Sequence, residues 1–268
     1  MELLTYTFVQ YAFVGGIALA VVAGLLGPFV VQSQQSIASD MFAHVALAGI
    51  GAALLVGVSP WWGALPALLM VSTLVWWLLN SELYSADAIA MFFLSGGLAL
   101  ALAFIHIARD TAFSIESYLF GSILTLTSSD LVAILMAALL VVSSVTLLWY
   151  PLIGATQNPP HVVPGKRTPQ LILLLYFLIL AIVVWVGIKT IGGLLIGALL
   201  VIPVLIVRAH VRSFKGLATG SIGAAITAVV CGLLISLFFD IPPSSLIIGV
   251  LILLFIVQVV YRKLSTRV

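Results

Sequence analysis

The sequence contains very few charged residues. Asp, Glu, Lys and Arg together make up 7% of its 268 residues, whereas a soluble domain of ordinary composition contains about 25%. Hydrophobic residues make up 63% of the chain, and a soluble fold of this size has too little interior to bury that much apolar surface. A lipid bilayer is the solvent in which exposed apolar surface costs little, so the composition predicts an all-α, polytopic membrane protein.

Features that other functions require are also missing. The single cysteine, Cys231, cannot form an intrachain disulfide and alone makes a poor metal site. Gly165-Lys166 lacks the upstream glycine and the following hydroxyl of an ATP-binding phosphate loop. No nucleophile–base arrangement stands out, and the net charge of +2 is small and dispersed. We therefore expect neither an enzyme nor a nucleic-acid-binding protein, and no permanently bound cofactor.

Long apolar runs follow one another along the chain. The runs that can span, or nearly span, the roughly 30 Å of bilayer hydrocarbon are residues 8–31, 37–58, 62–79, 87–108, 130–150, 170–188, 191–208, 217–238 and 244–261. The first is expected to be a retained helix, because Met1–Gln10 lacks the basic residues of a signal peptide. Two short runs meet around Lys189–Gly193, where glycines mark a turn or an unwound break. The sequence thus predicts eight or nine transmembrane helices in one bundle, with residues 1–268 forming a single domain.

Basic residues indicate the orientation in the membrane. They form three clusters, which are Lys166 with Arg167, then Arg208, Arg212 and Lys215, and finally Arg262, Lys263 and Arg267. All three fall on one side if runs 170–188 and 191–208 both cross, and the positive-inside rule makes that side cytoplasmic. The C-terminus is then cytoplasmic, and Lys189, Asp240 and the loop 109–130 are external. The N-terminus lies outside with nine crossings and inside with eight.

Polar side chains inside apolar runs are candidates for function, because a charged group at the bilayer centre costs about 2.5–3.5 kcal/mol. Asp40 and His44 are the strongest pair, since a spacing of four residues puts them on one face of a helix. A carboxylate oxygen and an imidazole nitrogen there could share one Mn²⁺, Fe²⁺ or Zn²⁺ ion. The alternative is a hydrogen-bonded Asp–His pair near a helix start, with Ser39 or Asp40 as N-cap.

The remaining polar residues have simpler interpretations. His106 ends an apolar run and is expected at the membrane interface, and the tryptophans near both ends of run 62–79 are typical interface anchors. Residues 117–125, between Glu116 and Asp130, are too short to span and suggest an amphipathic or re-entrant piece. Asp240 either attracts cations at an external mouth or caps the helix introduced by the prolines that follow it.

Three stretches together resemble a known family, the membrane-permease subunits of bacterial ABC importers for manganese, zinc and iron. They are Ser39–Gly49, which contains Asp40 and His44; Ser117–Leu124 with Asp130-Leu131 after it; and Lys189–Pro203 followed by Asp240–Ser244. The stretches follow the order and spacing of the family, and the resemblance covers about residues 10 to 260. Each is modest alone, and together they are fairly specific.

The resemblance implies a permease of the type II ABC-importer kind, with two copies packed around a central path. Its implied partners are two cytoplasmic ATPase subunits, an extracytoplasmic metal-binding protein and the lipid of a bacterial cytoplasmic (inner) membrane. The family's intramembrane metal site falls on Asp40 and His44, with Asp240 as an entrance residue. The transported ion would be Zn²⁺ or Mn²⁺, with Fe²⁺ also compatible.

The sequence departs from the family pattern in two places. Residues 32–36 carry glutamine and serine where the family usually has basic residues. Residues 154–165 are rich in proline where the family usually has an acidic, alanine-containing helix that docks on the ATPase, so no regular helix is expected there. A secondary ion-coupled transporter and a non-transporting membrane scaffold remain the alternatives to an ATP-driven permease.

Overall fold

The chain forms a bundle of helices. The computed structural model describes residues 6–81, 83–108, 118–119, 121, 123–157, 168–193, 195–239 and 241–265. Their helices are α1 (Thr7–Gln32), α2 (Ala38–Val56), α3 (Pro60–Asn80), α4 (Ala86–Ala108), the 3-10 turn η2 (Ile123–Thr125), α6 (Ser128–Leu147), α7 (Trp149–Gln157), α8 (Thr168–Thr190), α9 (Ile196–Arg208), α10 (Phe214–Phe239) and α11 (Pro243–Ser265). Each predicted apolar run therefore corresponds to a helix, and run 130–150 extends from α6 into the first residues of α7.

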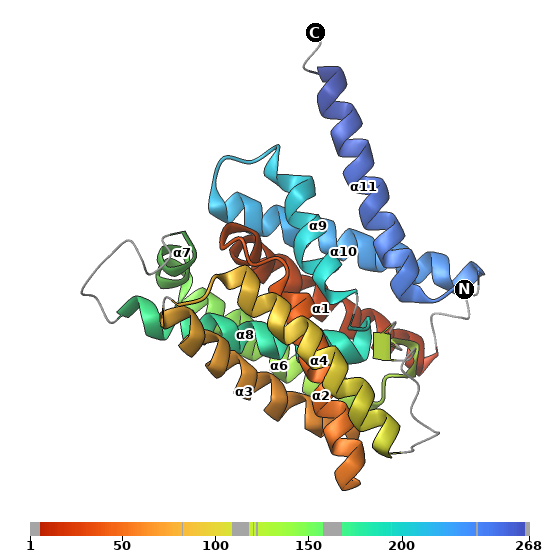
Figure 1. Cartoon of the computed structure of the whole chain (residues 1–268). Helices are drawn as coiled ribbons and strands as arrows, with labels where there is room; N and C mark the ends of the chain where they lie inside the picture. The colour runs from red at the N-terminus through yellow and green to blue at the C-terminus, as the bar shows by residue number, and fades with distance from the viewer. Residues whose placement is uncertain are drawn as a thin grey trace.

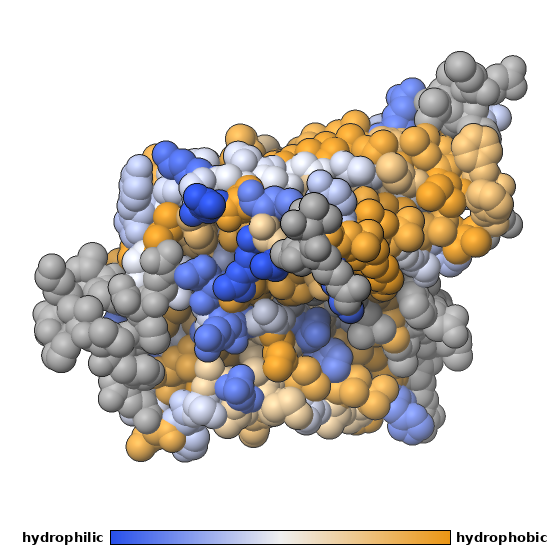
Figure 2. All heavy atoms as spheres, turned by 90° about the horizontal axis from the view of Figure 1, so that it is seen from above, coloured by the Kyte–Doolittle hydropathy of each residue, from blue (hydrophilic) through white to orange (hydrophobic). Residues whose placement is uncertain are grey.

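Eight helices of the described residues are long and apolar enough to cross a membrane, and α9, with 13 residues, is shorter. Seen from above, orange hydrophobic residues cover much of the surface, and blue hydrophilic residues gather in the middle of the view (Figure 2). The expected all-α membrane fold with eight or nine membrane helices is confirmed. This outcome follows from the bilayer, where backbone groups must find their hydrogen-bond partners within the chain.

Helix α2 packs against α3, α4, α8 and α9, and most of its side chains are buried. It runs antiparallel to α3, because the residues around Gly49 meet those around Gly63 across the tight turn between the two helices. On another side α1 packs along α10, and α10 continues into α11, which leans away from the bundle toward the C-terminus (Figure 1).

The predicted interruption between the sixth and seventh apolar runs, 170–188 and 191–208, is present. Helix α8 ends at Thr190, α9 begins at Ile196, and Gly192 between them has φ 102°, a conformation that residues with a side chain rarely adopt. Thr190 and Ile191 are buried, so the chain unwinds inside the protein. Such a break is tolerated at membrane depth because protein surrounds it.

Helix α7 corrects one expectation. No regular helix was expected over residues 154–165, yet residues 154–157 form the last turn of α7. Pro151 lies in the first turn of this helix, where its missing N–H removes no hydrogen bond, and the later prolines follow the helix end. Trp149 of α7 makes edge contacts with Phe29 of α1 and Phe214 of α10, with ring centroids 5.4 and 5.6 Å away. These contacts fix α7 across the end of the bundle (Figure 1).

Candidate functional site

One face of helix α2 is accessible. Asp40 is exposed, and His44, Ala48 and Ala52 are partly buried, whereas their neighbours on the other faces are mostly buried. These four residues follow one another at intervals of four, so they form a single stripe along the helix. The stripe begins with a carboxylate and an imidazole and continues with two methyl side chains. The structure thus places Asp40 and His44 together, as their spacing predicts.

The ring of His44 has a defined partner on α4. Its Nδ1 atom lies 3.0 Å from the carbonyl oxygen of Leu94. A carbonyl oxygen can only accept a hydrogen bond, so Nδ1 carries the proton and donates it. In the neutral ring this arrangement leaves the lone pair on Nε2. Metal-binding histidines are commonly held in this way, with one ring nitrogen donating to a carbonyl and the other left for the ion.

Asp40 lies against the first turn of α9. A Cβ built on Gly197, the second residue of α9, would overlap Oδ1 of Asp40 and lie 3.0 Å from Oγ of Ser39. Glycine at position 197 therefore leaves the space that the carboxylate occupies. Gly197, which follows the helix break, thus helps to position Asp40. The spacing of residues within α2 does not predict this contact.

The capping alternative for this pair is wrong. Helix α2 begins at Ala38 with Ile37 as its N-cap residue, and no side chain caps the helix. Ser39 is buried and donates instead to the carbonyl of Ser36, at 3.1 Å. Asp40 is already the third residue of the helix, so its carboxylate extends from the helix side.

The other predicted site residues do not join this pair. Asp240 lies outside the described residues. His106 is exposed in the last turn of α4, where an interfacial residue was expected. Among the residues that the structure describes, no group of three or more His, Cys, Asp or Glu side chains could hold a metal ion. Within this part of the chain, Asp40 and His44 supply at most two protein ligands of these types.

The segment before α6 supports the backbone of α2. The buried hydroxyl of Tyr118 donates to the carbonyl oxygen of Ala43, directly before His44. The carbonyl oxygen of Tyr118 in turn accepts from the N–H of Gly193 in the helix break, at 3.0 Å. Of the predicted piece 117–125, the described residues Tyr118 and Ile123 are buried, and Tyr118 connects the candidate site to the α8–α9 break.

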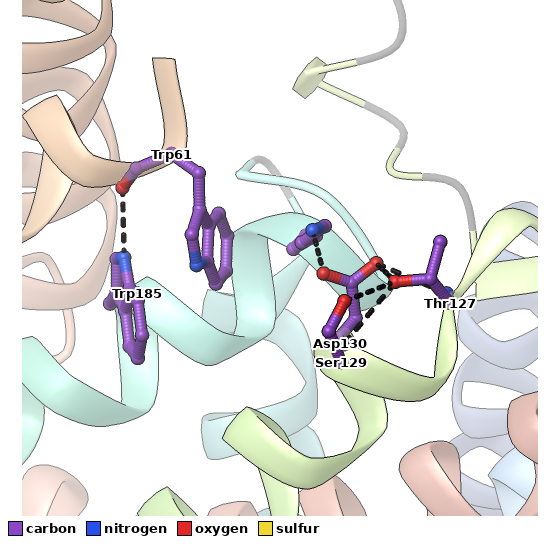
Figure 3. Close-up of polar contacts among 6 residues, drawn as sticks. Trp61, Thr127, Ser129, Asp130 and Trp185 are labelled. Carbon is purple, nitrogen blue, oxygen red and sulfur yellow. Dashed lines mark hydrogen bonds and ion pairs between the residues drawn. The ribbon is translucent and has the colours of Figure 1, made fainter. Parts of the chain in front are cut away.

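A second polar cluster joins α3, α6 and α8 (Figure 3). Lys189 forms an ion pair with Asp130 and lies 4.9 Å from the ring centroid of Trp61. The ring of Trp185 packs against that of Trp61 at a tilt of 31°, and Trp185 Nε1 donates to the Trp61 carbonyl at 3.2 Å. These contacts attach the C-terminal end of α8 to two other helices.

Asp130 has a further role in this cluster. Its carboxylate accepts from the N–H of Thr127, and Thr127 Oγ1 accepts from the N–H of Asp130, so the two residues form a capping box at the start of α6. This pairing was not predicted from the sequence. The signal was present in the sequence, because Thr127-x-x-Asp130 directly before an apolar run is the pattern of a capping box.

The described helices form a polytopic membrane protein, with a polar pair on one face of α2 and a broken helix beside it. Over residues 5–262 the sequence matches the ABC 3 transport family, and the chain belongs to this family. The resemblance to permease subunits of metal ABC importers, inferred from the three sequence stretches, is thereby confirmed.

Individual relatives cover most of the chain. It is 24% identical over 253 residues to the high-affinity zinc uptake system membrane protein ZnuB of Haemophilus influenzae, covering 94% of this chain and 97% of the relative. It is 24% identical over 253 residues to the manganese import system permease protein ScaB of Streptococcus gordonii, covering 94% and 91%. Its fold is similar to PsaBC from Streptococcus pneumoniae in complex with Fab, with a TM-score of 0.80, 21% identity, and coverage of 94% and 91%.

Proposed function

We propose that this chain is the permease subunit of an ATP-driven importer for a divalent transition metal, and that Asp40 and His44 bind the ion during transit. The observation that carries the proposal is the contact from His44 Nδ1 to the Leu94 carbonyl, because it leaves Nε2 available beside a carboxylate. One oxygen and one nitrogen ligand suit Zn²⁺, Mn²⁺ and Fe²⁺. The relatives' names refer to zinc and to manganese, so they leave the choice between these two ions open.

A site with few protein ligands suits transport. An ion held by Asp40 and His44 keeps several coordination positions for water or for other groups, and so it is released more easily than from a closed structural site. The short side chains of Ala48 and Ala52 leave space along the same face. Asp240 is proposed as an entrance residue on the external side.

Two copies of the chain are proposed to enclose the path. Asp40 is exposed in the single chain although its helix is a membrane span. A carboxylate facing lipid near the bilayer centre would cost about 2.5–3.5 kcal/mol. A second copy packed around a water-filled path removes this cost, because Asp40 then faces water or the transported ion.

The energy source and the delivery of the ion require further partners. The partners proposed are cytoplasmic ATPase subunits and an extracytoplasmic metal-binding protein, with the permease in a bacterial cytoplasmic membrane and its C-terminus in the cytoplasm. Helix α7 is the proposed ATPase contact, since it lies across the end of the bundle and Tyr150, Pro151 and Gly154 are exposed on it. Its aromatic contacts to α1 and α10 would transmit a movement of the ATPase to the membrane helices.

The broken helix favours one alternative, a secondary transporter driven by an ion gradient. Interrupted helices such as α8–α9 are common in that class. The two functions differ in their energy source. Uptake by proteoliposomes that requires the ATPase and ATP supports the permease, whereas uptake by the chain alone that a protonophore stops would support the alternative.

The site is tested by Asp40→Ala and His44→Ala in the purified protein and in reconstituted uptake. We expect one transition metal among Mn²⁺, Zn²⁺ and Fe²⁺ to raise the thermal stability of the wild type, since a ligand of the folded state stabilises it. The rise and the uptake should both disappear in either variant. Matched controls are Asp87→Ala and His106→Ala, which remove an exposed aspartate and an exposed histidine of α4. Normal uptake by both site variants would refute the assignment.

A further inference from the structure

Helices α10 and α11 touch at one end and separate at the other. Near their junction a Cβ on Gly232 would lie 2.7 Å from the backbone of Ile247, so the two helices are in close contact there. Toward its C-terminus α11 leans away from α10 (Figure 1). Between the later turns of α11 and the end of α9 lies a crevice of about 750 Å³, which is the size of a small-molecule site.

The walls of this crevice have two different characters. Leu205 from α9 and Phe255 and Val259 from α11 form an apolar part. Arg208 at the end of α9, with Arg262 and Lys263 in the last turns of α11, form a cationic part. The cationic residues lie at the ends of their membrane helices, and the apolar residues lie one or more turns further into the membrane. The crevice is thus charged at the membrane surface and apolar below it.

This arrangement matches one class of ligand. A phospholipid with a net negative charge carries a phosphate at the level of the membrane surface and acyl chains directly below it. Basic pockets between membrane helices on the cytoplasmic side are typical sites for such headgroups. Arginine is suited to phosphate because its planar group can donate two parallel hydrogen bonds. The positive-inside rule, from which the orientation was predicted, puts these basic residues on the cytoplasmic side.

We propose that the crevice between α9 and α11 binds an anionic phospholipid, with Arg208, Arg262 and Lys263 at the phosphate and Leu205, Phe255 and Val259 along the acyl chains. The bound lipid fills the space between the end of α9 and the later turns of α11. The proposal does not depend on the metal site, because none of these residues belongs to the stripe on α2.

The experiment uses native mass spectrometry of the detergent-purified chain with added dioleoyl phosphatidylglycerol. Dioleoyl phosphatidylcholine and inorganic phosphate are added in parallel samples. We expect a specific phosphatidylglycerol adduct, with neither phosphatidylcholine nor phosphate binding comparably. Equal binding of phosphatidylcholine would overturn the proposal, because the cations would then contribute nothing. Phosphate that binds and displaces the lipid equally well would show a free-anion site and would also overturn it.

The variants remove equal charge inside and outside the crevice. In Arg208→Gln/Arg262→Gln, affinity for phosphatidylglycerol should fall on the order of 10- to 30-fold, since each basic residue at an anionic membrane surface contributes a several-fold factor. Arg212→Gln/Lys215→Gln removes two basic residues of the α9–α10 turn and the start of α10 that do not line the crevice, and it should bind as the wild type does. Equal effects of both double variants would overturn the proposal in favour of unspecific attraction.

Two further readouts keep the test decisive. If the crevice variant does not fold, wild-type adducts measured at about 0.1 M and about 1 M salt must decrease, since screening weakens exposed ion pairs. Adducts that persist unchanged at high salt would overturn the proposal. If the crevice variant keeps its lipid and instead loses the second copy or the ATPase, the crevice is a protein interface and the lipid proposal is wrong.

Discussion

Gly197 of α9 and the carboxylate of Asp40 on α2 occupy adjoining space, with no room between them for a further carbon atom. The contact joins the helix after the break to the helix that carries the candidate metal site. It makes position 197 a sensitive place to test the site without removing a ligand.

Gly197→Ala should separate metal binding from stability. The new methyl group would meet the end of the Asp40 side chain, which can rotate away at little cost to the fold. Displacing a ligand in this way is expected to weaken metal binding on the order of 10-fold. Isothermal titration of the metal and the thermal midpoint in detergent measure the two effects. Gly96→Ala on α4 is the matched control, because a Cβ there meets nothing within 4 Å.

Tyr118→Phe should lower stability by about 1 kcal/mol, the usual net contribution of one hydrogen bond. The variant removes the donor to the Ala43 carbonyl and keeps the ring, which packs against Gly193. Uptake should fall as well, because Ala43 directly precedes His44. Tyr84→Phe serves as the control, since Tyr84 is 56% exposed. A wild-type midpoint and wild-type uptake for Tyr118→Phe would show that this hydroxyl does not support the site.

Lys189→Met and Asp130→Asn should destabilise the protein by less in combination than the sum of the two single effects. The two residues form an ion pair between α8 and α6, and residues in direct contact couple by about 0.5–3 kcal/mol. The effect of Asp130→Asn includes the capping box of α6, whereas that of Lys189→Met includes the contact with Trp61. Thermal unfolding of the four proteins in one detergent gives the coupling. Strict additivity would mean that the pair contributes nothing to stability.

The membrane helices could be predicted from the sequence because the bilayer imposes one simple requirement. Each crossing needs about 20 apolar residues, and runs such as 87–108 and 217–238 meet it without ambiguity. The break after Lys189 was also predictable, since adjacent glycines interrupt an apolar run there. The sequence pattern failed at α7, because proline density over the whole loop was weighed without regard to position, and Pro151 lies where a helix accepts it.

The candidate site was predicted only in part. The spacing of Asp40 and His44 fixes their common face, because the helix period does so for any sequence. The partner of His44, however, is the backbone carbonyl of Leu94. Every residue has a backbone carbonyl, so the amino-acid sequence does not indicate which carbonyl will lie within hydrogen-bonding distance of His44. The same is true of Ala43, which accepts from Tyr118 through its backbone. The alternative of an N-cap at Ser39 or Asp40 is wrong because the helix starts at Ala38, before both residues.

The interruption between α8 and α9 creates a helix start beside Asp40. The first N–H groups of a helix have no partner within it, and the aligned peptide dipoles give this end a partial positive charge. Gly197, in that first turn, adjoins the carboxylate of Asp40. The negative charge of Asp40 is therefore partly balanced by the helix start. At the proposed metal site an ion would gain only the remaining attraction, so the unwound segment would favour rapid exchange over retention.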